Sequence, residues 1–478
     1  MKLINKGEPE KKHRLIILTD MENEPDDSQT MVKLLMYSNE IDIEGLIAVT
    51  STWLRKEVYP ESIYDRVKAY GIVRDNLELH ASNWPSEEEL LSKVAGGQKG
   101  YGMGAVGENQ NTKGADLIIK AVDADDPRPV HIAINAGANT LAQALWDVKN
   151  TRSEEEVKKF VSKIRVYDDS GQDDAGAWIC HTFPEIFYIR SKAQVFGLFG
   201  PEQNAGPQPW APLDQYDWAE KNIRTRHGIL GALYPRRLFK DGRFLFMEGG
   251  GTASWYGLVN KGLYNPSEIS WGGWGGRFSS EKEQIWAGQG NVDELEKKYE
   301  PFYMYPETED YSWEFDGGSG DKEWDEFSGV SNSGTFHSNI FYPLWRWRDA
   351  YTRDFKGRMD WCVKSYKNAN HHPIAVLFGD DNRTILRAKA QPDELIELDA
   401  SESKDPDGDL LNFKWYTYPE AGNYDGDIKI NNNDSVVANV RIPEDAKNKQ
   451  IHIILEVTDD NPIVNLTSYR RLVIDVES

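Results

Sequence analysis

The sequence predicts an α/β domain with a mostly parallel sheet, followed by an all-β sandwich. Buried-strand and helix patterns alternate from residue 13 to about 260, which implies crossover connections between parallel strands. From residue 374 to 478, short strands of alternating character stand between turn signals, as in an antiparallel sandwich. A chain of 478 residues is long enough for two separate cores. We therefore expect domains at 13–372 and 373–478.

The elements of the α/β region follow from local patterns. Leu15 to Leu18 are four bulky apolar residues in a row, typical of a strand buried on both faces. Pro60 opens a helix, because proline is tolerated in the first turn. Further strands are expected at 43–49, 130–134, 164–167 and 194–198, and further helices from residue 31, at 116–122, and after Asn139 and Thr140 as a cap.

The stretch from about 262 to 372 is irregular, glycine-rich and aromatic. Loops are expected at 271–277 and 316–320, and helices at 281–300 and 338–368. Long loops beside an α/β core either carry function or cover the core, and the pattern leaves both open. Many of the 16 tryptophans lie here, and tryptophan also stacks on the flat faces of sugars.

The tail has its own pattern. Its expected strands are separated by turn signals such as the one at 405–408. Asp399, Asp405, Asp407 and Asp409 are spaced like oxygen ligands, so this loop is either a weak calcium site or a plain turn. The expected strands lie at 396–398, 413–417, 451–457 and 472–476.

Charge and hydropathy restrict the partners. Asp and Glu outnumber Lys and Arg by 78 to 55, a formal charge of −23, and no basic run occurs, which argues against nucleic acid. No apolar stretch approaches the roughly 20 residues of a membrane span. The start, Met1 to Arg14, lacks the apolar middle of a signal peptide. Cys180 and Cys362 lack metal-ligand spacing and are expected to be buried free thiols.

A cluster of carboxylates directly follows the first strand. Open α/β sheets place their ligands where strands end and helices begin. Carboxylates this close either bind a hard metal or hold one another protonated, although Asp26 and Asp27 could also serve only as helix-capping residues. Five acids fall within eight residues: Asp20, Glu22, Glu24, Asp26 and Asp27.

Two further loops follow strands in the same way, and a glycine-rich stretch joins them as a candidate. Asn139 sits two residues after Gly137, and the stretch from Asp168 to Asp174 holds four acids. Residues 247–255 combine Glu248 with three glycines. If the sheet is parallel, these loops reach the same edge and converge on one site. No Gly-x-Ser-x-Gly, His-Glu-x-x-His or phosphate-binding glycine loop occurs, which excludes serine hydrolases, zincins and P-loop enzymes.

At this point the chain resembles a known family. The spacing of Asp20, Glu22, Asp26 and Asp27 is similar to the Asp-x-Asp-x-x-x-Asp-Asp signature of nucleoside hydrolases. Several blocks in order resemble the bacterial cellulose-binding proteins with a nucleoside-hydrolase-like domain, and the tail resembles polycystic-kidney-disease-type and cadherin-like sandwich modules. These blocks are 20–27, 34–40, 126–129, 137–144, 173–178 and 271–277.

The resemblance implies a Rossmann-like, nucleoside-hydrolase-like domain and roles for individual residues. It assigns catalysis and calcium binding to Asp20, Glu22 and Asp27, and no organic cofactor. Nucleoside hydrolases complete the calcium shell with a late aspartate, and here the comparable stretch begins with Glu248, so either Glu248 substitutes or the metal is weak or absent. Substrate contacts are expected from Asp26, Asn139, Asp173, Asp174, Glu248, Trp271, Trp274 and Arg277.

The function implied by the resemblance is glycan processing. The leading expectation is a secreted or periplasmic glycosyl hydrolase that acts on a carbohydrate, such as a furanoside, through the acid cluster. A carbohydrate-binding protein without catalysis is the alternative, and a nucleosidase is a weaker one. The sequence leaves the sugar, the linkage and the oligomeric state open.

Overall fold

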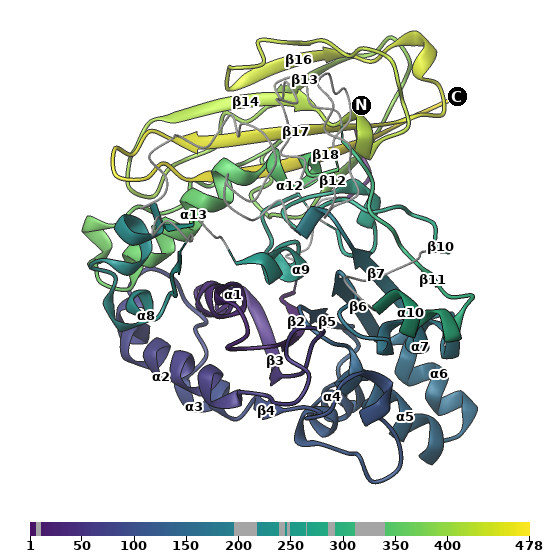
Figure 1. Ribbon diagram of the computed structural model, residues 1–478. Coiled ribbons are helices and arrows are strands. Elements are labelled where there is room, and N and C mark those ends of the chain that lie inside the picture. Colours follow the sequence, from purple (N-terminus) through teal and green to yellow (C-terminus); the bar gives the residue numbers. More distant parts are fainter. Residues whose placement is uncertain are drawn as a thin grey trace.

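The computed structural model describes residues 1–5, 11–195, 218–238, 244–245, 249–263, 265–284, 292–310 and 340–478. An α/β region lies beneath a β-sandwich, and both chain termini lie at the sandwich (Figure 1). Among the described residues, no helix has both the length and the apolar character to cross a membrane. Cys180 and Cys362 are buried free thiols, as predicted.

The α/β region is built on a six-stranded sheet of order β4-β3-β2-β5-β6-β7, and every neighbouring pair is parallel. This confirms the predicted fold class. The strands are β2 (His13–Thr19), β3 (Ile41–Ala48), β4 (Val94–Gly96), β5 (Val130–Ile134), β6 (Ile164–Asp169) and β7 (Phe187–Ser191). The helices between them are α1 (Pro25–Leu35), α2 (Pro60–Leu77), α3 (Glu87–Leu91), α4 (Lys113–Asp123), α5 (Asn139–Thr151), α6 (Glu154–Ser162) and α7 (Ala175–Thr182).

Successive side chains of β2 point to opposite faces of the sheet, and helices cover both faces. Leu15 and Ile17 pack in the cluster that contains the apolar residues of α1 and α2, whereas Ile16 and Leu18 pack with α4 and α5. Figure 1 shows these two pairs of helices on opposite sides of the sheet. All four strand residues are fully buried, as the unbroken apolar run predicts.

Three local predictions were wrong. The last strand of the sheet is Phe187–Ser191 and not 194–198, since Gln194 and Val195 follow the strand and 196–198 lie outside the described residues. Asn139 is the first residue of α5 and does not cap it; Ala138 holds the cap position. Within the helix predicted at 281–300, residues Glu283–Gln284 form β10 and pair with β11 (Tyr303–Met304).

The rest of the α/β region consists of short elements, and the helix predicted at 338–368 divides in two. The predicted loop at 316–320 lies outside the described residues. The elements are α8 (Gly228–Ala232), β8 (Arg237–Leu238), β9 (Phe244–Leu245), α9 (Ala253–Tyr256), α10 (Val292–Glu296), α12 (Tyr342–Trp345) and α13 (Arg348–Trp361).

The C-terminal strands form two sheets with a separate core. One sheet has the order β1-β12-β18-β17-β14 and the other β13-β16-β15, and their facing residues make one apolar cluster. The extreme N-terminus joins the first sheet, because Lys2 and Leu3 pair with β12. The strands are β1 (Lys2–Leu3), β12 (Leu386–Ala390), β13 (Leu395–Asp399), β14 (Leu411–Thr417), β15 (Ile430–Asn431), β16 (Val437–Arg441), β17 (Gln450–Asp459) and β18 (Thr467–Val476).

The aromatic stretch before the sandwich covers the core and joins the two regions. Trp255, Trp274 and Trp347 are at most 2 % exposed and belong to the same cluster as α1. That cluster also contains Tyr418 and Tyr469 of the sandwich. Of the two alternatives that the sequence left open for this stretch, the structure therefore supports the covering of the core.

One buried carboxylate ties this junction together. Asp354 on α13 accepts hydrogen bonds from the Tyr37 hydroxyl at 2.7 Å and from Arg358 Nε at 2.9 Å, and Lys261 Nζ lies 2.6 Å away. His372, just before the sandwich, also contacts it. Although burial alone would raise the pKa of Asp354, the nearby charges of Lys261, His372 and Arg358 hold it well below its ordinary value.

This network predicts a large loss of stability for Asp354→Asn. The amide keeps the shape but removes the charge that compensates Lys261 and Arg358, and uncompensated buried charges cost about 3–5 kcal/mol. Urea denaturation would measure the change in the free energy of unfolding. The matched control is Asp349→Asn on the same helix, where an exposed pair with Arg353 should contribute below about 1 kcal/mol. Equal effects of the two substitutions would contradict this account.

Candidate functional site

Four loops meet at the carboxyl edge of the parallel sheet. They follow β2, β5 and β6, and the fourth is the stretch from Gly249 to Ser254. Ser254 Oγ donates to Asn135 Oδ1 at 2.8 Å, and Gln172 Nε2 donates to the Asn135 carbonyl at 2.9 Å. The hydroxyls of Thr30 on α1 and Thr252 are 3.2 Å apart. The loops that the sequence placed after strands therefore contact one another.

Two buried carboxyls, one directly after β2 and one in the first turn of α1, share a hydrogen bond. Asp20 and Asp27 are 3 % and 6 % exposed and bond to each other through their side chains. Burial raises the pKa of Asp20 to about 7. Burial, together with the charge of Asp20, raises the pKa of Asp27 well above its ordinary value. The pair therefore holds a proton near neutral pH, as two carboxyls that cannot both ionise must do.

A third buried acid comes from β6. Burial raises the pKa of Asp169 well above its ordinary value, and the charges of Asp26 and Asp27 raise it further. Ser170 Oγ donates to Asp169 at 2.6 Å. The sequence motifs do not single out Asp169, although strand alternation contains a signal, because Asp168 and Asp169 must point to opposite faces of the sheet. Asp168 instead accepts from Tyr188 and Arg190 on β7.

Asp173 and Asn139 form a second polar group at the same edge. The Asn139 backbone N–H donates to Asp173 Oδ2 at 3.1 Å, and the side-chain amide of Asn139 donates to Thr50 Oγ1 and the Gly100 carbonyl. Burial raises the pKa of Asp173 to about 7. Asn139 Oδ1 is buried without a hydrogen-bond partner, so it remains an acceptor that a ligand could use.

Asp174 faces a different direction. Its Oδ1 accepts from the Met103 backbone N–H at 2.8 Å, and its Oδ2 lies 2.7 Å from Lys298 Nζ. Gly102 packs so closely that an added Cβ would clash with Asp174 Oδ1. These contacts hold the 101–105 loop and η7 (Lys297–Tyr299) against the start of α7, which suits a positioning role for Asp174.

Glu22 lies apart from the Asp20–Asp27 pair. Its backbone is left-handed, with φ 73°, and its carboxylate accepts from Ser62 Oγ and lies 3.7 Å from an Arg66 nitrogen on α2. Glu22 is also exposed, in contrast to the buried pair. In this arrangement its carboxylate connects the loop to α2 and is turned away from the position that a metal ligand beside Asp20 and Asp27 would need.

Trp271, Trp274 and Arg277 are buried in the junction with the sandwich. The Trp271 ring packs edge-on against His452 at 5.0 Å, and Trp274 packs against Tyr256 at 5.5 Å. Arg277 Nε donates to Asp310 Oδ1 at 2.6 Å. With Trp271 and Trp274 at 5 % and 2 % exposure, their rings offer no free face to a sugar, so their burial does not support the expected stacking role. Glu248 lies outside the described residues.

The acid cluster has the donor chemistry of a hard cation site. Asp20 Oδ2 is buried without a hydrogen-bond partner, and the neighbouring donors are carboxylate oxygens, which calcium prefers. In the tail, ligand oxygens of Asp405, Asp407 and Asp409 lie within 4.8 Å of one another, so this triad could also hold a metal. Part of its capacity is already used, because both Asp407 oxygens face His371 Nδ1.

Comparison with known proteins identifies relatives of both regions. The family described as cellulose-binding Sde182, nucleoside hydrolase-like domain, matches residues 14–278, and the C-terminal domain of cellulose-binding protein Sde0182 matches residues 395–476. No curated protein matches the chain.

One solved structure resembles the whole chain. It is a nucleoside hydrolase-related hypothetical protein from Saccharophagus degradans, described as associated with carbohydrate metabolism; it is 38 % identical, covers 98 % of this chain and 100 % of its own, and has a TM-score of 0.81. The effector protein XOO4466 matches over 47 % of this chain and 65 % of its own at 13 % identity and a TM-score of 0.27, which is too low to support an argument.

The raised pKa values predict how Asp27→Asn changes stability. The folded state binds protons on Asp20 and Asp27 more tightly than the unfolded state does, so this contribution is complete below the ordinary pKa of 3.8 and is lost as the pH rises toward about 7. Asp27→Asn removes one repelling charge and keeps the hydrogen bond. We expect a melting midpoint several degrees above wild type at pH 8 and close to it at pH 4.

The control for this measurement is Asp75→Asn, which changes an exposed carboxylate on α2. It should leave the midpoint within about a degree of wild type at both pH values. A lower midpoint for Asp27→Asn at pH 8 would show that the carboxylate acts as a stabilising cap at the start of α1.

Proposed function

This chain belongs to the cellulose-binding Sde182 family with a nucleoside-hydrolase-like domain, and we propose that it hydrolyses a glycosyl bond of a carbohydrate at the acid cluster. The observation that carries the proposal is the set of three buried acids, Asp20, Asp27 and Asp169, with raised pKa values at the carboxyl edge of the sheet. Acids that keep protons near neutral pH suit general acid–base catalysis.

The hydrogen bond between Asp20 and Asp27 determines which acids serve as general base and which as general acid. Carboxyls on opposite sides of a glycosidic bond stand about 5 Å or more apart, so a pair in hydrogen-bond contact acts on one water molecule instead. In this proposal the charged member of the pair accepts the proton of the attacking water. Asp169, held protonated by burial, donates its proton to the leaving oxygen.

The proton count of this scheme balances. Water loses one proton to the Asp20–Asp27 pair, and the leaving group receives one from Asp169. The charge of Asp26 raises the pKa of both Asp20 and Asp169, so Asp26 is close to both groups that must exchange a proton to restore the site. Asn139 and Asp173 remain to bind sugar hydroxyls, through the unpartnered Asn139 Oδ1 and a carboxyl with a raised pKa.

Calcium would fit the same carboxyls. Asp20 and Asp27, with Asp26 beside them, would hold it, and a bound divalent cation would replace the shared proton and lower the pKa of a coordinated water. Glu22 would take no part, since it contacts Ser62 and Arg66.

A carbohydrate-binding protein without catalysis is the second candidate. The family description names cellulose binding, and the displaced Glu22 departs from the carboxylate set that the nucleoside hydrolase signature implies. Such a protein needs hydroxyl contacts and aromatic surfaces but no proton donor.

Calcium binding has a direct test. Calcium at a few millimolar should raise the melting midpoint of the wild-type protein, because a ligand of the native state stabilises it. Asp27→Asn should abolish the rise, whereas Asp409→Asn in the tail triad should preserve it. If only Asp409→Asn abolishes the rise, the ion binds in the tail and the acid cluster works without it.

Hydrolysis is tested by release of reducing sugar from a panel of β-glucans and arabinofuranosides. We expect products with at least one of them, and a loss of about a hundredfold or more in Asp20→Asn and Asp169→Asn, because each removes a proton-transfer group. Asp75→Asn should have wild-type activity. Binding without any product across the panel would favour the second candidate, and release of a free base from nucleosides alone would favour a nucleosidase.

A further inference from the structure

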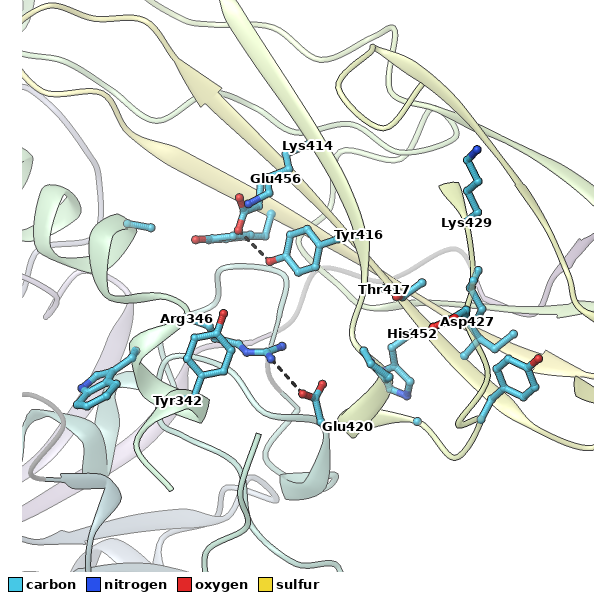
Figure 2. Close-up of a pocket in the computed structure, with 18 of the residues that line it drawn as sticks. Tyr342, Arg346, Lys414, Tyr416, Thr417, Glu420, Asp427, Lys429, His452 and Glu456 are labelled. Atoms are coloured by element: carbon cyan, nitrogen blue, oxygen red, sulfur yellow. Dashed lines mark hydrogen bonds and ion pairs between the residues drawn. The ribbon is translucent and has the colours of Figure 1, made fainter. Parts of the chain in front are cut away.

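A large cleft lies between the α12–α13 segment and the sandwich, and none of the acid-cluster residues line it. Its volume is about 1550 Å³, above the roughly 300–1,000 Å³ typical of sites for one small molecule. Figure 2 shows Tyr342 and Arg346 on the helical side and Tyr416, Lys414 and Glu456 on the sheet side. Its size suits a ligand of several linked units.

The aromatic side chains of the cleft are held in place by the protein. The Tyr416 hydroxyl donates to Glu456 at 2.8 Å, and the Tyr424 hydroxyl donates to Asp445 at 2.7 Å. Both tyrosines line the cleft and remain partly exposed. A ring fixed through its hydroxyl loses little entropy when a flat ligand packs on it.

Arg346 forms a rigid part of the wall. Its guanidinium stacks on the Tyr418 ring at 3.9 Å and reaches Glu420 at 3.4 Å and Asp310 at 3.2 Å. These contacts join α12 to η9 (Pro419–Ala421) of the sandwich. The cleft is therefore built by side chains with defined partners and is not a loose gap between two domains.

One histidine of the lining, His452, keeps a buried ring nitrogen without a hydrogen-bond partner. The residue is 1 % exposed and lines the cleft; its Nε2 pairs with Gln450 Oε1 at 3.0 Å, while Nδ1 is buried without a partner. Burial lowers the pKa of His452 well below its ordinary value, so the imidazole is neutral. A neutral nitrogen of this kind suits a hydroxyl and not an anion.

The charges of the lining also favour an uncharged ligand. Both signs are represented almost equally in the lining, with four lysines and arginines and five carboxylates, although the whole chain carries a net charge of −23. Such a surface has no dominant sign to attract an ion, but it offers many donors and acceptors.

We propose that this cleft is a second carbohydrate site, which binds several residues of a neutral oligosaccharide chain. Aromatic rings supply the flat surfaces, and the balanced charged groups and His452 supply hydroxyl contacts. The choice of a sugar ligand rests on the proposed function, whereas the position of the site rests on the cleft alone.

The test is calorimetric titration of the full chain with cellohexaose, a neutral β-glucan. We expect binding, weakened about tenfold or more by Tyr416→Ala and independently by Tyr424→Ala, because removal of one central aromatic contact has that effect. Tyr303→Ala is the matched control, since Tyr303 is an exposed tyrosine on β11, away from the cleft. Unchanged melting midpoints would show that the variants are folded, and either tyrosine variant suffices if the other fails to fold.

Two results would overturn the proposal. Cellohexaose binding that Asp27→Asn abolishes and both tyrosine variants preserve would assign the sugar to the acid cluster, which leaves the proposed hydrolysis intact. Tighter binding of hexagalacturonate than of cellohexaose would show that the cleft selects anions. Conversely, wild-type binding by Asp20→Asn, together with loss of its hydrolysis, would support both sites separately.

Discussion

The buried carboxylate of Asp354 is the constraint on which the arrangement of the two regions depends. A single charge on α13 contacts Tyr37 at the end of the α1 segment, Lys261 after α9, Arg358 one turn away and His372 before the sandwich. Tyr37, Lys261 and His372 come from three other parts of the chain, so none of these segments can move without leaving the buried carboxylate short of a partner. The aromatic residues around this network fill the remaining space and bring Tyr418 and Tyr469 of the sandwich into the same core.

In the acid cluster, burial has the opposite effect on the carboxyls and keeps them protonated. Around Asp354 cations neutralise the charge, whereas the neighbours that raise the pKa of Asp27 and Asp169 are other acids. The carboxyls of this site therefore stay protonated near neutral pH instead of forming ion pairs. Their burial lowers the stability of the protein, and the surrounding fold must offset this cost. A glycosyl hydrolase needs such proton reservoirs, and a hard cation would relieve the same repulsion.

The sequence was sufficient for the fold class because its signals are periodic and local. The apolar run from Leu15 to Leu18 and the alternating strands of the tail each report their own burial. The convergence of loops at the sheet edge followed from parallel topology alone. The directions of the side chains within those loops could not be predicted from the topology. The positive φ of Glu22 directs its side chain to α2. Only the register of β6 shows that Asp169, and not Asp168, is close to Asp26. The aromatic stretch was ambiguous because exposed and buried tryptophans look alike in a sequence.

The rigid junction also determines how the proposed cleft and the acid cluster can cooperate. Tyr351 on α13, one wall segment of the cleft, packs on Tyr256 and Trp274, and Tyr256 packs in turn on Tyr37 beside α1. An unbroken set of buried rings thus connects the helix that borders the cleft with α1, which follows Asp20 and contains Asp27. A glycan chain anchored in the cleft would have a fixed position relative to the acids, without the spread that a flexible linker introduces. Such a connection raises the effective concentration of the chain at the acid cluster only when the chain is long enough to reach it, so the length of the oligosaccharide, more than the identity of its sugars, should govern how strongly the two sites are coupled.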